Sequence, residues 1–208
     1  MIIEDRDFRL CNPAIFNEIT DLVINVDTLF DFMKEGGKLA DPGELRIVPR
    51  AKEILDEAVN DPHTAIVDIK DCHTYFSVEL KFYGAHAIKG EPGADTIEEL
   101  KEYEDKAFIF EKNSTNFMWA PGFIEFLFSL PNLERVKILG VLSCKCVDNG
   151  AVGIKTFFDQ FNKDIEVAVY ADAIDTYDAP GHDRAEYNNT AVEHMKYNNI
   201  KVLGKVLK

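Results

Sequence analysis

The stretch Leu22-Val23-Ile24-Asn25-Val26, which Asp27 follows directly, has the composition of a buried β-strand. It is short, apolar and rich in branched side chains. Five more runs of this kind follow along the chain, and amphipathic stretches with helical spacing separate most of them. The later runs are 65–69, 107–110, 136–141, 166–170 and 200–203, and the helical stretches are 49–59, 96–103, 122–130, 147–161 and 186–197.

This alternation predicts an α/β fold with an open, mainly parallel six-stranded sheet and helices on both faces. The chain has 208 residues and no internal repeat or linker, so we expect a single domain over 1–208, with 1–20 as an N-terminal extension packed on it. Segment 29–43 is expected to be a loop over the sheet edge, because Gly36-Gly37 and Pro42-Gly43 are turn signals.

The composition excludes several classes of partner. A net charge of -14 argues against nucleic acids and anionic membrane surfaces, which need clustered Lys and Arg. The N-terminal stretch carries charges where a signal peptide needs apolar residues, and the richest apolar run, 123–130, is too short to span a membrane. Four cysteines are too few for a disulfide scaffold, so free thiols and a cytoplasmic location are expected.

Ionisable or nucleophilic residues follow five consecutive expected strands. In an open parallel sheet, ligands bind beyond the carboxyl ends of the strands, so these residues are predicted to meet in one crevice. They are Asp27 after the first strand, Asp71 and His73 after the second, Lys112 after the third, Ser143, Cys144 and Cys146 after the fourth, and Asp172 after the fifth.

Cys146 stands at the start of the expected helix 147–161, where the helix dipole favours a thiolate. The alternative is a small buried apolar residue, which describes most free cysteines. Cys144 offers half of a C-x-C metal or redox pair, but no second pair accompanies it. Asp27 and Lys112 can serve as base and ammonium beside a thiol, or simply as a turn former and a solvated lysine.

A group of carboxylates and imidazoles lies between the second and third expected strands. Asp71, His73, Glu79 and His86 fall within sixteen residues, and these ligand types suit zinc, iron or manganese. An extended D-x-H segment lets both side chains reach one ion. The alternative is a hydrogen-bonded surface loop without a metal.

Over about 22–178, these residues resemble the nicotinamidase branch of the isochorismatase-like cysteine hydrolases. Lys112 stands where that family has a lysine. The motifs that carry the resemblance are Val26-Asp27-Thr28-Leu29-Phe30-Asp31-Phe32 with Gly36-Gly37-Lys38-Leu39-Ala40, then Asp71-Cys72-His73, then His86-Ala87-Ile88-Lys89-Gly90-Glu91-Pro92-Gly93-Ala94, and last Gly140-Val141-Leu142-Ser143-Cys144-Lys145-Cys146-Val147.

The resemblance implies a three-layer α/β/α fold and a role for each matching residue. Asp27 is the expected base, Lys112 the catalytic lysine and Cys146 the nucleophile. Three positions depart from the family pattern, in which Asp, Cys and Trp stand at the places of Cys144, Ala87 and Tyr83. The implied cofactor is one divalent metal ion, with zinc favoured over iron or manganese. Its implied ligands are Asp71, His73, His86 and, as in some members, Glu79.

The implied reaction is hydrolysis of nicotinamide to nicotinate and ammonia through a thioester, as part of NAD salvage. The implied substrate is a small planar amide whose ring nitrogen binds the metal directly or through water, and the protein is expected to be a homo-oligomer. Two alternatives stay open: a sibling amidohydrolase for another carbamoyl or aliphatic amide, and a non-enzymatic metal- or thiol-binding protein. The resemblance also implies an oxyanion hole from the backbone N–H groups of Leu142 and Cys146, a cis peptide at about Val141-Leu142, and a ring clamp from Phe32, Tyr83 and Trp119.

Overall fold

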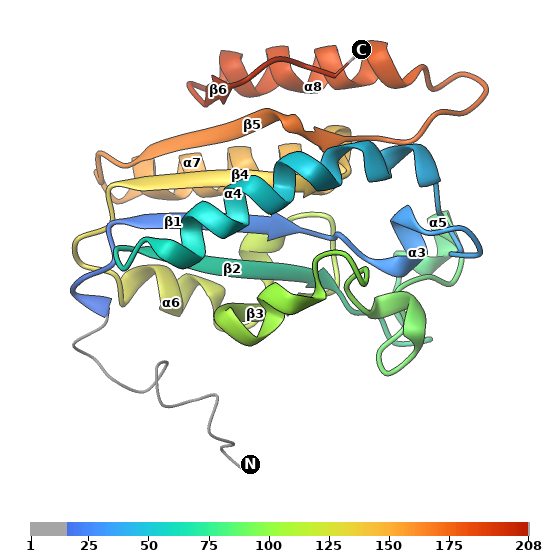
Figure 1. Cartoon of the computed structure of the whole chain (residues 1–208), viewed down its shortest axis with the longest axis horizontal. Helices are drawn as coiled ribbons and strands as arrows, with labels where there is room; N and C mark the ends of the chain where they lie inside the picture. Colours follow the sequence, from blue (N-terminus) through green and yellow to red (C-terminus); the bar gives the residue numbers. More distant parts are fainter. Residues whose placement is uncertain (1–15, 208) are drawn as a thin grey trace.

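A computed structural model describes residues 16–207 and shows one parallel sheet in the order β3-β2-β1-β4-β5-β6 (Figure 1). The chain runs outward from β1 through β2 to β3 and then returns to place β4 on the other side of β1. The order in which the strands are added to the sheet therefore reverses between β1 and β4, and open α/β sheets bind ligands at such a reversal. The strands are β1 (Asp21–Val26), β2 (Thr64–Asp71), β3 (Ala107–Lys112), β4 (Arg135–Val141), β5 (Glu166–Asp175) and β6 (Lys201–Leu203).

Helices cover both faces of the sheet, as the sequence predicts (Figure 1). Helix α4 (Val48–Asn60) buries Ile54 and Leu55 on one face. On the other face, α6 (Phe123–Phe128), α7 (Asp148–Gln160) and α8 (Arg184–Tyr197) share a second apolar cluster. Alternate strand residues point to opposite faces, so Leu22 and Ile24 join the second cluster while Val23 joins the first.

Two predicted elements differ from the structure. Segment 96–103 is not an α-helix but a series of turns leading into a 3₁₀ helix, η3 (Lys101–Lys106). Its buried residues Ile97, Leu100 and Tyr103 are each three apart, a spacing that suits three residues per turn. Segment 29–43 is not all loop, because it includes the short helix α3 (Phe30–Met33) and the start of the 3₁₀ helix η1 (Pro42–Ile47).

The fifth strand is longer than predicted, and this moves one expected site residue. β5 continues to Asp175, so Asp172 lies within the strand and not beyond its end. There it pairs with the Nε atom of Arg50 at 3.3 Å, away from the expected crevice. The polar residues inside β5 hide the continuation of the strand from an apolar pattern search.

The predicted N-terminal extension, 1–20, lies mostly outside the described residues, as does Cys11. Among residues 16–207, no helix has the length and apolar character needed to cross a membrane. The remaining short elements are α5 (Leu80–Tyr83), η2 (Pro92–Ala94), η4 (Phe117–Trp119) and η5 (Ser143–Val147), of which α5 and η5 carry residues of the site.

Candidate active site

Three strand ends bring Asp27, Lys112 and Cys146 together, as predicted. The Nζ atom of Lys112 lies 2.8 Å from Oδ2 of Asp27 and 3.6 Å from Sγ of Cys146. All three side chains are buried, with Asp27 and Lys112 each only 1 % exposed. Because each residue comes from a different strand end, the topology of the sheet assembles the group.

The backbone holds Asp27 in one orientation. Asp27 has φ +50°, a left-handed conformation that is uncommon for a residue other than glycine. Its N–H donates to the carbonyl of Ile69 at 2.9 Å, and its Oδ1 accepts the N–H of Asp71 at 2.7 Å. These bonds tie the carboxylate to the end of β2 and leave Oδ2 facing Lys112.

In this buried group, burial and the neighbouring charges shift the pKa values of Asp27 and Lys112 in opposite directions. Burial raises the pKa of Asp27 to about 6, even though the Lys112 ammonium acts to lower it. Burial acts to lower the pKa of Lys112, but Asp27 and Asp71 outweigh it and raise that pKa well above its usual value. Asp27 is therefore a carboxylate at neutral pH, and Lys112 keeps its charge.

The Cys146 thiol differs from the expectation of a resting thiolate. Burial raises its pKa well above the usual value, and the opposing effect of Lys112 does not compensate. Cys146 also lies inside the π-helical turn η5, because α7 begins only at Asp148. The resting nucleophile is thus a thiol that needs a base, and Asp27 is in reach: ligand atoms of Asp27, Asp71 and Cys146 lie within 4.8 Å of one another.

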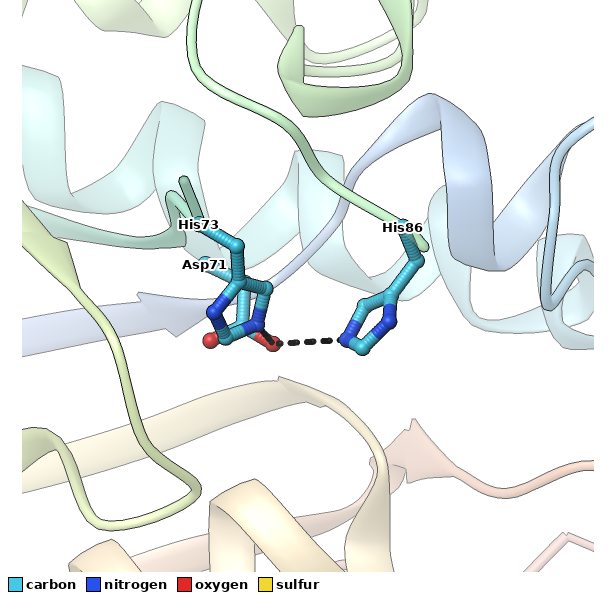
Figure 2. Close-up of side chains that lie close together, drawn as sticks. All are labelled: Asp71, His73 and His86. Atoms are coloured by element: carbon cyan, nitrogen blue, oxygen red, sulfur yellow. Dashed lines mark ion pairs between the residues drawn. The ribbon is translucent and has the colours of Figure 1, made fainter. Parts of the chain in front are cut away.

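Asp71, His73 and His86 form a second buried group beside the first (Figure 2). Oδ2 of Asp71 lies 3.6 Å from Nε2 of His73 and 3.9 Å from Nε2 of His86. The other oxygen of Asp71 bonds Lys112. Asp71 therefore joins the two groups through its two oxygens, a link that the residue pattern alone did not indicate.

The residues present fit a divalent metal ion. The Nδ1 atoms of His73 and His86 donate to Oδ1 of Asn113 and to the carbonyl of Gly84, both at 2.8 Å, which turns each Nε2 inward. Nε2 of His73 is buried without a hydrogen-bond partner. Two imidazoles oriented in this way, with one carboxylate, are a typical donor set for zinc, iron or manganese.

A second group with metal-ligand side chains, Asp27, Asp71 and Cys146, is not a metal site. The ammonium of Lys112 lies among these three side chains and contacts each of them. A metal ion there would be next to a buried positive charge. We therefore assign only the histidine group to a metal.

Sequence reasoning missed two residues that support the histidines. Asn113 accepts from His73 and also from the Ser77 hydroxyl at 2.6 Å. Asp31 is buried and accepts the N–H groups of Ala87 at 2.8 Å and of Lys38 at 3.0 Å, which anchors the chain next to His86. The sequence signal that could have found them is that Asn113 directly follows Lys112 and Asp31 directly precedes Phe32.

A pocket that is partly open to solvent connects the two groups. Phe32 and Tyr83, the expected ring contacts, line it. Glu79, expected as a fourth metal ligand, also lines the pocket but is not among the residues grouped as metal ligands. Trp119 does not line it: its side chain is 72 % exposed at the end of η4, whose other residues, Phe117 and Met118, are buried in the core. The full lining is Asp27, Phe32, Leu39, Asp71, Glu79, Tyr83, His86, Thr115, Leu142, Lys145 and Cys146.

The nucleophile turn begins at a cis peptide bond between Val141 and Leu142, where the resemblance placed one. Gly140 precedes it with φ +116°, and a Cβ there would lie 2.1 Å from the carbonyl oxygen of Val26. Only glycine therefore lets β4 approach β1 this closely. The carbonyl of Leu142 accepts the N–H groups of Lys145 and Val147 at 3.0 and 3.1 Å.

Cys144 faces away from the group of Asp27, Lys112 and Cys146. Its Sγ lies 3.2 Å from Oγ1 of Thr176 and 3.5 Å from Nε2 of His182. The turn is instead tied down by Ser143, whose hydroxyl donates to Asn188 at 2.5 Å. Asn188 in turn donates to Asp175 at 2.7 Å. These hydrogen bonds hold the nucleophile turn in place, although Cys144 stands where the family has an aspartate.

The comparisons with known proteins agree with this geometry. A family model described as the isochorismatase domain matches residues 21–203. A Bacillus subtilis protein named uncharacterized isochorismatase family protein PncA is 26 % identical over 171 residues, which cover 77 % of this chain and 88 % of that protein.

Two solved structures show the same fold. The pyrazinamidase/nicotinamidase of Streptococcus mutans is 20 % identical, with a TM-score of 0.76 over 88 % of this chain and 100 % of that one. The pyrazinamidase of Pyrococcus horikoshii in complex with zinc is 25 % identical, with a TM-score of 0.67 over 88 % of this chain and 98 % of that one. The chain belongs to the isochorismatase family of hydrolases.

Proposed function

We propose that this protein is a metal-dependent cysteine amidohydrolase that converts nicotinamide to nicotinate and ammonia, a reaction of NAD salvage. The observation that carries the proposal is the position of Lys112, whose ammonium contacts Asp27, Cys146 and the metal-site residue Asp71. A protein that only binds a metal has no need for a buried lysine beside a thiol. The named activities of the structural relatives support the same substrate class.

Acylation begins with proton transfer from the Cys146 thiol to the Asp27 carboxylate. The sulfur then attacks the amide carbon, and the oxygen takes up negative charge where the backbone N–H groups of Leu142 and Cys146 are proposed to donate to it. Asp27 passes its proton to the amide nitrogen, the carbon–nitrogen bond breaks, and ammonia leaves. The product of this half-reaction is a thioester on Cys146.

Hydrolysis of the thioester uses the same base. Asp27 accepts a proton from water, the hydroxide oxygen bonds to the acyl carbon, and the carbon–sulfur bond breaks. The sulfur recovers the proton, so enzyme and base return to their starting state and nicotinate departs. Lys112 stays charged throughout and stabilises whichever of Asp27 and Cys146 is the anion.

The proposal places the pyridine ring in the pocket. Phe32, whose ring centroid is 5.7 Å from that of His86, and Tyr83, at 6.4 Å, are proposed to contact its faces. When held by Asp71, His73 and His86, a divalent ion supplies a Lewis-acid coordination point for the ring nitrogen. The free thiols of Cys72, Cys144 and Cys146 favour a reducing, cytoplasmic setting.

Steady-state ammonia release tests this proposal. Protein loaded with zinc, iron or manganese is assayed with nicotinamide and with benzamide, which has the same shape but no ring nitrogen. We expect ammonia and nicotinate from nicotinamide and much slower turnover of benzamide. No turnover of nicotinamide, with turnover of an aliphatic or carbamoyl amide, would assign the protein to a sibling amidohydrolase.

A further inference from the structure

Lys145 lies between two cysteines that face opposite ways in the turn η5, and its own side chain lines the pocket. Its Nζ atom is 3.9 Å from the ring centroid of Tyr83, which belongs to α5 and is partly exposed at the pocket mouth. The ammonium is therefore near the nucleophile Cys146 in sequence and lines the same pocket.

The charge of Lys145 is not matched by a carboxylate within residues 16–207. It is the one lysine or arginine among the described residues that line the pocket. Several other lysines of the described chain pair with carboxylates, and Lys112 is enclosed by two. Examples on the surface are Lys34 with Glu99, Lys52 with Glu102 and Lys70 with Glu104.

An ammonium that rests on an aromatic face keeps its hydrogen-bond donors for other partners. Lysine has three N–H donors and no acceptor, and the ring attracts the charge without accepting all of them. Two of the three carboxylates that line the pocket, Asp27 and Asp71, are engaged by Lys112, and the third, Glu79, forms no ion pair with Lys145. The acceptor that best complements Lys145 is therefore an anionic group brought by a ligand.

We propose that Lys145 selects amides whose acyl part carries a carboxylate a few bonds from the scissile amide. The inference rests on the proposed amidase function and extends its substrate class from nicotinamide to related amides that carry a carboxylate on the acyl part. A substrate whose carbonyl lies at Cys146 has its acyl group in the same pocket that Lys145 lines. The opposing hypothesis is that Lys145 only holds the ring of Tyr83 in place, which would help charged and neutral substrates equally.

Matched substrates separate these two roles. The probes are nicotinamide with a carboxylate at ring position 5 or 6, each compared with its methyl ester, which has similar shape and no charge. We expect kcat/KM of the wild-type protein to be about tenfold higher for one carboxylate probe than for its ester, the scale of one charge-assisted hydrogen bond. Lys145→Met should bring the ratio close to one, and Lys145→Arg should retain most of it.

Two control variants make the result specific. Lys81→Met removes the same charge from an exposed lysine of α5 that does not line the pocket, and should leave the ratio unchanged. Tyr83→Leu removes the ring but leaves the ammonium, so it should weaken both probes and preserve their ratio. Equal use of acid and ester by the wild-type protein, or equal losses for both in Lys145→Met, would overturn the inference.

Failure of the proposed function is visible separately. If the metal-loaded protein hydrolyses no amide, calorimetric binding of the same acid and ester probes to Cys146→Ala still decides the inference. Tighter binding of an acid that depends on Lys145 supports it, and equal binding contradicts it. Hydrolysis of nicotinamide without any preference for the acids leaves the amidase function standing and removes only the role of Lys145.

Discussion

The pocket has two walls of different character. The sheet-end wall consists of Asp27, Asp71 and Cys146, and Lys112, which does not itself line the pocket, contacts all three. All four side chains are buried. The outer wall is segment 74–85, in which Phe76 is 96 % and Phe82 77 % exposed and α5 has no buried residue. The groups that move protons are thus on the most constrained part of the molecule, and Tyr83 and Glu79 are on an exposed part.

The outer wall is attached mainly at its ends. His73 and His86 bound it, and the N–H groups of His73 and Lys89 join its two ends through the carbonyls of Ala87 and His73, both at 2.8 Å. Between those ends, Ser77 is the buried anchor through its bond to Asn113. Chemistry and binding should therefore respond separately to mutation. Three predictions test this separation, and a fourth concerns a buried carboxyl outside both walls.

The largest effect is expected at the nucleophile of the sheet-end wall. Cys146→Ala should abolish ammonia release, because no other sulfur contacts Lys112 within the described chain, while circular dichroism and metal content stay unchanged. Cys144→Ala is the matched control and should retain most activity, since its sulfur faces Thr176 and His182. The reverse pattern would mean that the wrong cysteine has been assigned.

Asp27→Asn keeps the shape of the base but cannot take the thiol proton, so turnover should fall by at least ~10²-fold. Lys112→Met removes the charge that stabilises both anions and should be similarly severe. Because the groups act as one unit, the double variant should lose much less than the product of the two single losses. Rates of the singles and the double measure this; fully multiplicative losses would show that Lys112 acts independently of Asp27.

A smaller effect, confined to binding, is expected at the outer wall. His86→Ala, or removal of metal by chelation, should raise KM about tenfold or more, the scale of one lost polar contact. The rate at which a small alkylating agent modifies Cys146 should barely change, because His86 does not contact the sulfur. An unchanged KM in fully metal-free protein would contradict the separation of the two walls.

The smallest effect concerns Asp68, a buried carboxyl in β2 that belongs to neither wall. Burial raises its pKa to about 7, and its Oδ1 accepts from Asn25 at 2.7 Å. Among residues 16–207, no cation forms an ion pair with Asp68 as Lys112 does with Asp27. The folded state therefore binds more protons than the unfolded state between about pH 4 and 7, so stability falls as pH rises through that window.

Asp68→Asn cannot ionise and keeps an acceptor for Asn25, so it should escape that loss. Above pH 7 the variant should be more stable than the wild type by about 1 kcal/mol or more, or ~2–4 °C in Tm, with little difference near pH 4. Thermal melts of both proteins across pH 4 to 8 measure the difference. A constant difference at all pH values would show that ionisation of Asp68 is not its cause.

Much of the fold follows from local pattern. All six strands were predicted at nearly their observed places, because apolar branched runs of this length are distinctive when buried on both faces. The predictions were wrong where tertiary packing, and not the local sequence pattern, sets the secondary structure. Segment 96–103 has amphipathic spacing but packs as turns, and β5 continues through polar residues.

The site was predicted less completely than the fold. The rule that parallel strands present their carboxyl ends to one crevice brought Asp27, Lys112 and Cys146 together without coordinates. Trp119 and Lys145 show its limit. Trp119 was expected in the pocket and is exposed to solvent, whereas Lys145, which directly precedes Cys146, lines the pocket. The packing of neighbouring residues decides the direction of each side chain.

The sequence by itself determined which residues stand at the strand ends and the order in which they come, because strand length and alternation are local properties. Only the tertiary structure decided that one carboxylate, Asp71, faces both Lys112 and the two histidines. It also decided that Cys146 rests as a thiol, since burial outweighs the nearby ammonium. Protonation and shared contacts depend on solvent exclusion and on distances between segments far apart in the chain. Neither quantity is determined by a single stretch of sequence.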